Sequence, residues 1–148
     1  MNILMAIDFS SVTDAMIEAL PICEGSSGGF SQIYVVHAAE PDPAFVGWEG
    51  GPYVVRSQMA EKFRGEHRDL AAIADRLRVG RTVKVTPLLM QGPTVETILE
   101  QAQKLEAGLI VVGSHGHGAA YDLTVGSISS GLIRRSPVPV LVVPSPER

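Results

Sequence analysis

The chain has 148 residues, a length that allows one ordinary domain and does not favour two compact ones. Hydrophobic residues make up 45% and charged residues 19%, so the composition excludes a disordered tail and provides for a core. A net charge of −4, with no dense run of Lys or Arg, disfavours binding to a nucleic-acid backbone. The single cysteine, Cys23, excludes an intramolecular disulfide and a cysteine-rich zinc site. No apolar run is long enough to span a bilayer, and without a basic leader we expect a cytoplasmic protein.

Five segments have patterns typical of β-strands. Four are nearly continuous apolar runs, as expected for strands buried on both faces of a sheet: residues 1–8, 32–38, 109–112 and 138–143. The fifth, residues 82–88, alternates between apolar and polar side chains, which indicates a strand with one wetter face. Pro87 within it cannot donate a backbone hydrogen bond, so we expect this strand at an edge of the sheet.

Helical patterns lie between the strand segments. The first begins near residues 10–14, whose hydroxyls and carboxylate can cap a helix, and Pro21 should kink or end it. Further apolar stripes predict three more helices: residues 55–77, a helix opened by Gly92-Pro93 and ended by Gly108, and residues 124–135. Residues 40–53 are rich in Pro and Gly and are expected to form a long irregular connection.

Strands and helices therefore alternate from one end of the chain to the other. This alternation predicts a parallel sheet with helices on both faces, connected by right-handed crossovers. Ligands of such open sheets bind beyond the carboxyl ends of the strands. The segments to consider for function are those that follow the strands: Asp8-Phe9-Ser10, His37-Ala38, Met90-Gln91-Gly92 and the residues from Gly113 onward.

The most informative segment is Gly113-Ser114-His115-Gly116-His117-Gly118, followed later by Gly126-Ser127. A glycine loop leaving a strand lets backbone N–H groups approach an anion, and the N-terminus of the next helix favours negative charge. The two serine hydroxyls could add donors. Together these elements would form a polyphosphate cradle; the simpler interpretation is that the glycines only form turns.

Two other phosphate-binding motifs do not fit this segment. Ala119-Ala120 stand where a Walker P-loop needs Lys and Ser or Thr. The glycine spacing also differs from G-x-G-x-x-G, and the segment follows the fourth strand instead of the first. Neither a P-loop nor a dinucleotide-binding motif is therefore expected.

The spacing Gly113-x2-Gly116-x9-Gly126-Ser127 resembles the ATP-binding signature of the universal stress protein family. The segments LIVVGSHGHG, VGSISSGLIRRSPVPVLVVP, NILMAIDFS and IYVVHAAE are also similar to that family. The resemblance covers nearly the whole chain, so residues 1–148 are expected to form one universal stress protein domain. It implies a three-layer α/β/α fold of the adenine nucleotide alpha-hydrolase type, with a five-stranded parallel sheet in the order 3-2-1-4-5.

The resemblance further implies a binding site for ATP, with Mg²⁺ as an optional companion. Asp8 would hold the ribose hydroxyls, and the backbone at Ala38, with His37 as a further candidate, would hydrogen-bond the adenine edge. The residues implied to line the phosphates are Gly113, Ser114, Gly116, Gly126 and Ser127. His117 stands where the family commonly has Arg, which would weaken the attraction of phosphate near neutral pH.

Several of these residues have simpler interpretations. Asp8 could serve only as a helix cap. His115 and His117, with His37 nearby, could bind a metal, but carboxylate partners at clear spacing are lacking, and polar histidines near phosphate are expected instead. Asp122 is expected to be a solvated loop residue; the alternative is that it helps to hold Mg²⁺ on the phosphates.

The function expected from these features is that of a nucleotide-dependent stress-response switch. Any hydrolysis should be slow, because the sequence offers no P-loop lysine, no positioned base and no convincing pair of metal-binding carboxylates. The alternative is a nucleotide-independent dimerisation and interaction module of the same family. A hydrolase using Ser114 and His115 is disfavoured, since sequence neighbours seldom place nucleophile and base correctly.

The apolar strand from Val138 to Val143 bears on assembly. In the expected strand order it lies at an edge of the sheet, where unpaired backbone groups invite another chain. The resemblance implies a homodimer through these strands, antiparallel to each other. The competing expectation is that Pro137, Pro139 and Pro144 block the pairing and keep the protein monomeric.

Overall fold

A five-stranded parallel sheet forms the centre of the computed structural model, which describes residues 1–23, 29–39, 53–114 and 125–145. The strand order is β3-β2-β1-β4-β5, which confirms the predicted order 3-2-1-4-5. Every pairing in it is parallel. The strands are β1 (Asn2–Ala6), β2 (Gln32–Ala39), β3 (Lys84–Gln91), β4 (Ala107–Gly113) and β5 (Val140–Val143).

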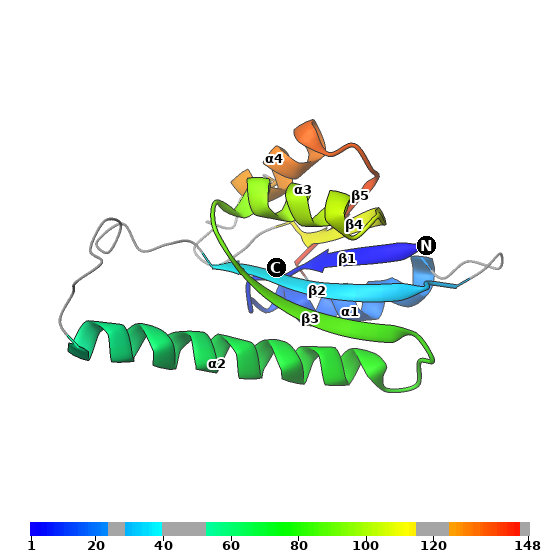
Figure 1. Cartoon of the computed structure of the whole chain (residues 1–148). Coiled ribbons are helices and arrows are strands. Elements are labelled where there is room, and N and C mark those ends of the chain that lie inside the picture. The colour runs from blue at the N-terminus through cyan, green and yellow to red at the C-terminus, as the bar shows by residue number, and fades with distance from the viewer. Residues whose placement is uncertain (24–28, 40–52, 115–124, 146–148) are drawn as a thin grey trace.

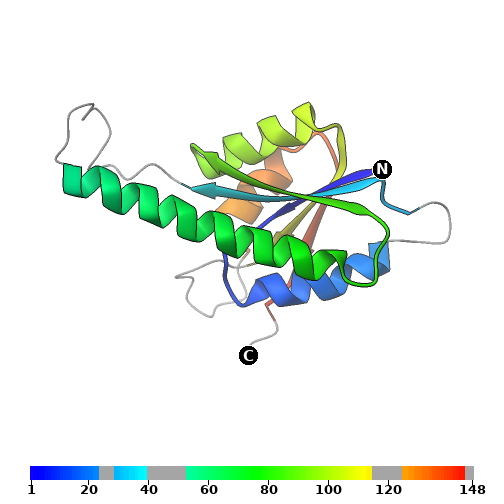
Figure 2. The same ribbon diagram turned by 60° about the horizontal axis from the view of Figure 1, so that its bottom comes forward.

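Helices cover both faces of the sheet, so the predicted three-layer arrangement is confirmed as well (Figures 1 and 2). They are α1 (Val12–Cys23), α2 (Tyr53–Arg78), α3 (Thr94–Lys104) and α4 (Ser127–Arg135). On β1, Ile3 and Met5 point into the core beneath α1 and α2, whereas Leu4 and Ala6 point into the core beneath α3 and α4. Successive side chains of a strand face opposite sides, which is why this strand is apolar throughout.

α2 is a long, charged helix of 26 residues. Its C-terminal half packs on the sheet through Leu70, Ala74 and Leu77, which are fully buried. Its N-terminal turns extend past the carboxyl end of β2 (Figures 1 and 2). Within the described parts of the chain, no helix combines the length and apolarity needed to cross a membrane.

The prediction that Gly108 ends the third helix is wrong. α3 ends at Lys104, and Gly108 lies inside β4. The chain turns at Glu106, which adopts the left-handed conformation (φ +50°) that glycine usually supplies after a helix. A Cβ on residue 108 would lie 3.2 Å from the Cβ of Met1, so glycine at this position allows the N-terminus to pack closely.

The start of α1 also differs from the prediction. The side chains of Ser10 and Thr13 do not cap the helix, because the Oγ of Ser10 and the Oγ1 of Thr13 are buried without hydrogen-bond partners. Asp8 forms a turn ahead of the helix, where its Oδ1 accepts the N–H of Ser10 at 3.1 Å, before α1 begins at Val12. At the other end, Pro21 falls within the last turn of α1.

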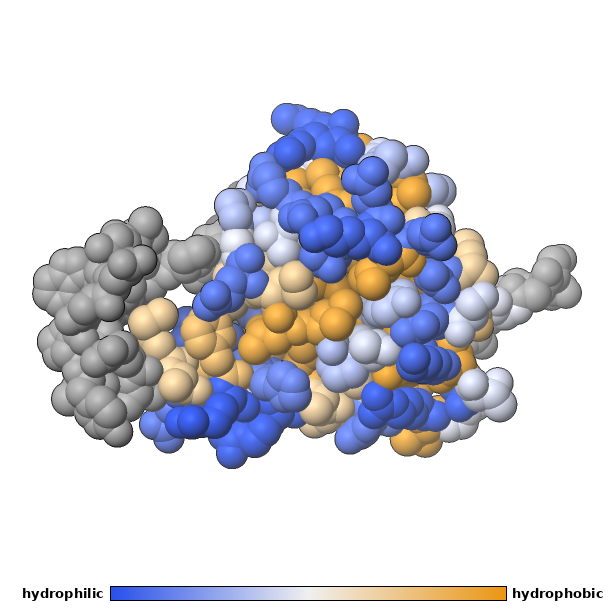
Figure 3. All heavy atoms as spheres, in the orientation of Figure 1, coloured by the Kyte–Doolittle hydropathy of each residue, from blue (hydrophilic) through white to orange (hydrophobic). Residues whose placement is uncertain are grey.

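The edge strand β3 is protected by the position of its proline. The Gly92 N–H donates to the Ala39 carbonyl, so even-numbered residues on β3 face β2 and odd-numbered residues face outward. Pro87 therefore occupies an outward position, where its missing N–H removes no bond from the sheet and hinders a further strand. This confirms the predicted edge position, on a strand whose half-buried residues form part of an apolar band (Figure 3).

α3 and α4 pack closely on the opposite face of the sheet. A Cβ on Gly131 would lie 2.9 Å from Cγ2 of Val95, so glycine lets the two helices approach. The Arg135 guanidinium on α4 hydrogen-bonds Glu96 on α3 and thereby lowers the pKa of that carboxyl. α4 thus lies beside α3, and the N-terminus of α4 lies at the carboxyl edge of the sheet, where the Gly126 N–H donates to the Ser114 carbonyl.

The two helical glycines should therefore respond oppositely to alanine. Gly65→Ala, on α2, places its Cβ where no atom lies within 4 Å, so it should raise the free energy of unfolding by about 0.5–1 kcal/mol. Gly131→Ala should instead lower the free energy of unfolding, because its Cβ would overpack against Val95 at a cost of roughly 1–3 kcal/mol. Urea unfolding followed by circular dichroism measures both values. Equal stabilisation by the two substitutions would contradict the close packing of α3 and α4.

Candidate functional site

The register of the sheet brings residues from three strands to one level at its carboxyl edge. Ala6 on β1 pairs with Val36 on β2 and with Val112 on β4. Three of the predicted site residues lie two positions beyond these paired residues: Asp8, Ala38 and Ser114. The sheet thus gathers the side chains and backbone groups that the sequence places after separate strands. Gly116 lies outside the described residues.

Two hydrogen bonds fasten the start of α4 to the end of β4. The Gly126 N–H donates to the Ser114 carbonyl at 2.7 Å, and the buried Ser129 hydroxyl donates to the Gly113 carbonyl at 2.6 Å. We call this pair of bonds the β4–α4 clamp. It holds two of the predicted glycines, Gly113 and Gly126, next to each other although 12 residues separate them.

The clamp presents the N-terminus of α4 at the edge of the sheet. The first bond within the helix runs from the Ser130 N–H to the Gly126 carbonyl at 2.9 Å, and the N-cap, Gly126, makes no side-chain cap bond. The backbone N–H groups of Ser127, Ile128 and Ser129 precede that bond and carry the positive end of the helix dipole. This is a favourable place for an anion such as phosphate.

Gly126 itself has an ordinary backbone conformation, with φ −57° and ψ 161°. Any residue can adopt it, so backbone freedom does not require glycine here. What glycine provides is the absence of a Cβ beside the first amides of α4.

Ser114 has a structural role in this arrangement. Its N–H donates to the Val143 carbonyl at 2.7 Å, and its hydroxyl accepts the Ser145 N–H at 3.2 Å. The backbone N–H of Ser114 is thus bonded to β5, and the hydroxyl, which was the predicted phosphate donor, accepts a bond from Ser145, which follows β5. Ser114 ties β5 and α4 to the end of β4.

Asp8 begins a tight turn between β1 and α1. Its Oδ1 accepts the Ser10 N–H, and Phe9 between them has φ +61°. A left-handed conformation at a bulky residue costs on the order of 1–3 kcal/mol and persists only when its surroundings hold it. The bond from the Ser10 N–H closes this turn ahead of α1, and the turn places the Asp8 carboxylate at the carboxyl end of the central strand.

The backbone of Ala38 faces the space beyond the end of β1. The Ile7 N–H donates to the Val36 carbonyl at 2.9 Å, so even-numbered residues of β2 point their N–H and C=O groups toward β1. β1 ends at Ala6, whereas β2 continues to Ala39. The donor and acceptor of Ala38 therefore point to where β1 no longer provides a partner strand.

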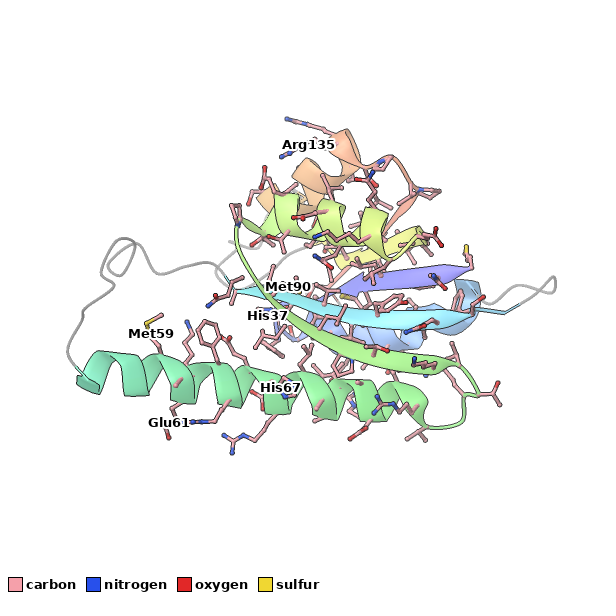
Figure 4. All side chains as sticks on the ribbon, viewed as in Figure 1. His37, Met59, Glu61, His67, Met90 and Arg135 are labelled. Carbon is pink, nitrogen blue, oxygen red and sulfur yellow. The ribbon has the colours of Figure 1, made fainter. Side chains whose placement is uncertain are left out.

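His37 points away from the adenine edge that the sequence suggested for it. Its backbone, at an odd-numbered position, faces β3, and its ring lies on the face covered by α1 and α2 (Figure 4). The ring Nδ1 lies 2.8 Å from the Ile7 carbonyl oxygen and, since a carbonyl only accepts, must carry the proton. The ring also packs on Phe9, with 4.5 Å between centroids.

Other candidates fall outside the described residues, namely His115, His117 and Asp122. Within the described ranges, no group of three or more His, Cys, Asp or Glu side chains is arranged to hold a metal ion. Sequence reasoning did not single out Ser129, whose hydroxyl closes the clamp. The sequence feature that could have indicated Ser129 is a small hydroxyl residue in the first turn of a helix that follows a glycine.

The chain was compared with known proteins. The model of the universal stress protein family matches residues 1–144. A relative from Thermus aquaticus, named "Universal stress protein in QAH/OAS sulfhydrylase 3'region", is 35% identical over 118 residues, covering 76% of this chain and 77% of the relative. The solved structure of hypothetical protein MJ0577 has a TM-score of 0.80 at 22% identity and covers 99% of this chain and 97% of its own. A universal stress protein from Archaeoglobus fulgidus in complex with dAMP has a TM-score of 0.65 at 17% identity, with 97% of each chain covered.

The fold and its edge define a doubly wound α/β protein with its polar groups collected beyond the carboxyl ends of the strands. With the match over residues 1–144, this chain belongs to the universal stress protein family. The resemblance inferred from the glycine spacing is thereby confirmed.

The β4–α4 clamp can be tested through two neighbouring serines. Ser129→Ala should lower the free energy of unfolding by about 1–3 kcal/mol, because it leaves the buried Gly113 carbonyl without its donor. Ser130→Ala is the matched control, since its hydroxyl makes a 3.2 Å bond to the Val125 carbonyl in an exposed position and should matter by less than about 0.5 kcal/mol. Chemical denaturation of both variants gives the values. Equal losses would show that Ser129 makes no special contribution.

Proposed function

We propose that this universal stress protein binds ATP at the carboxyl edge of its sheet and acts as a nucleotide-dependent stress-response switch. The observation that carries the proposal is the β4–α4 clamp, which holds the uncapped amides of Ser127–Ser129 beside the end of β4. Those amides suit the phosphate tail of a nucleotide. The described edge residues supply a different kind of group for each part of such a ligand.

The nucleoside half would lie across the end of β1. The Asp8 carboxylate can accept hydrogen bonds from the ribose hydroxyls, and the Ala38 N–H and C=O can pair with the adenine edge. The glycines at 113, 116 and 126, with Ser114 and Ser127, would surround the phosphates. The dAMP complex of the Archaeoglobus fulgidus protein supports an adenine nucleotide as the ligand class.

In the switch hypothesis, bound ATP contacts several elements of the fold at once. The nucleotide would connect the ends of β1 and β2 with the start of α4, and so bias the dimer or the surface offered to a partner. Any hydrolysis would be slow, and Mg²⁺ would be an optional companion of the phosphates. The cytoplasmic location expected from the sequence belongs to the same proposal.

ATP binding is tested by the double variant Gly116→Val plus Gly126→Val. A valine at 126 would put a side chain beside the first α4 amides, and the valine at 116 would change the second glycine of the signature, so ATP affinity should fall at least about 100-fold, to the limit of calorimetric detection. Gly65→Ala, on α2, is the control that should bind like the wild type. Equal ATP affinity in wild type and double variant would contradict the proposal, and adenine nucleotide released from heat-denatured wild type would support it.

The alternative, a nucleotide-independent interaction module of the family, gains no support from the described edge. It would be favoured if the purified wild type carried no nucleotide and showed no binding of ATP. The dimer expected from the sequence is compatible with both functions and needs a separate argument.

We further propose that β5 pairs with β5 of a second copy. The Ile110 N–H donates to the Pro139 carbonyl, and the Ser114 N–H donates to the Val143 carbonyl, so odd-numbered residues on β5 face β4. Pro139 thus points inward, whereas Val140 and Val142 present both N–H and C=O outward. The inward-facing Pro139 leaves the outward groups of Val140 and Val142 open, in contrast to the outward-facing Pro87 on β3.

Val142→Pro should remove an outward donor and convert the dimer to a monomer, as measured by light scattering after size exclusion. The matched control is Gln91→Pro, which removes an outward donor from the other edge, at the exposed end of β3, and should leave the dimer intact. A wild type that is monomeric at micromolar concentration would contradict the pairing. So would a Val142→Pro variant that remains dimeric.

A further inference from the structure

His37 contacts the chain on both sides of Asp8. Its Nδ1–H donates to the carbonyl of Ile7, 2.8 Å away, and its ring packs on Phe9. The turn that it grips includes the left-handed residue Phe9 and the bond from the Ser10 N–H to the Asp8 carboxylate. His37 comes from β2, so these contacts join two strands across the end of the shorter one.

The hydrogen bond from His37 to the Ile7 carbonyl lies where the hydrogen-bond ladder between β1 and β2 ends. The last ladder bond on this side runs from the Ile7 N–H to the Val36 carbonyl. If the parallel pattern continued, the Ile7 carbonyl would be the next acceptor, for the Ala38 N–H. The imidazole of His37 already donates to that carbonyl, and β1 turns away at Asp8.

We propose that His37 is a positioning residue for the nucleoside half of the site: it holds the Asp8 turn and keeps the Ala38 backbone directed at the ligand. This inference rests on the proposed function, because it assigns the role through Asp8 and Ala38. Among the described residues, the contacts given for His37 are to Ile7 and Phe9, and the β4–α4 clamp in the phosphate half is formed by other residues. Its effect is therefore on the recognition of adenosine and not on the phosphate tail.

The experiment compares three ligands, adenosine, ATP and inorganic tripolyphosphate, on four full-length proteins by calorimetry. His37→Phe keeps an aromatic ring and loses the Nδ1–H donor, whereas His37→Asn keeps a donor at nearly the same distance from the backbone. His67→Phe is the matched control, because His67 is exposed on α2 (Figure 4). The wild type is the reference for all three.

His37→Phe should weaken adenosine and ATP by the same factor, roughly three- to tenfold, and leave tripolyphosphate binding unchanged. His37→Asn should recover part of the loss, and His67→Phe should match the wild type. If His37→Phe loses tripolyphosphate affinity by the same factor as adenosine affinity, the substitution has disturbed the whole site, and that result overturns the positioning role. Wild-type affinity of His37→Phe for adenosine overturns it as well.

Amide hydrogen exchange separates this inference from the proposed function. In the unliganded protein, His37→Phe should speed exchange of the Ser10 amide, which donates to Asp8, relative to His67→Phe. Unchanged exchange would refute the hold on the turn whatever the ligand results. If the wild type binds neither adenosine nor ATP, the proposed function fails and the role toward nucleoside fails with it, and faster exchange would then show only a local structural hold.

Discussion

The site depends on one constraint, which is that the central strand ends before its neighbours do. β1 stops at Ala6, while β2 continues to Ala39 and β4 to Gly113. A strand in the middle of a sheet normally satisfies the backbone groups of both neighbours. Where it stops early, Ala38 on β2 presents a donor and an acceptor to the space beyond β1, whereas on β4 the Gly113 carbonyl is taken by the Ser129 hydroxyl. A flat ligand with hydrogen-bonding edges can take the place of the missing strand.

The proposed site has a second requirement, a positive end for the phosphate tail of a nucleotide, and the N-terminus of α4 offers one. The β4–α4 clamp orients α4 so that its first amides lie next to the end of β4. Glycine at 126 keeps a side chain away from those amides, although its φ of −57° would suit any residue. A phosphate site built from amides and a helix dipole depends little on which side chains surround it. That explains why a spacing of glycines is the most informative sequence feature.

Much of the fold could be predicted from the sequence because its causes are local. The apolar runs of β1 and β4 follow directly from burial on both faces, and Pro87 indicates an edge because it lacks a donor. The strand order came from the family resemblance, since periodicity does not say which strands are neighbours. Gly108 was misassigned because Glu106 adopts the left-handed turn that glycine would have been expected to make.

The contacts that shape the site were less accessible to sequence reasoning. His37 and Ile7 are separated by 30 residues, and their bond exists only once β1 and β2 are in register. Ser129 and Gly113 are brought together in the same way by the packing of α4 against β4. The sequence indicated Asp8, Ala38 and the glycines as candidate residues, but not the hydrogen bonds that His37 and Ser129 make beside them.

The most direct test of the account is the change in backbone amide resonances when ATP is added to the ¹⁵N-labelled protein. If ATP binds at this edge of the sheet, the amides of Ala38 and of Ser127, Ile128 and Ser129 should shift together and saturate with one dissociation constant. Shifts confined to other elements, with these four amides unmoved at saturating ATP, would contradict it.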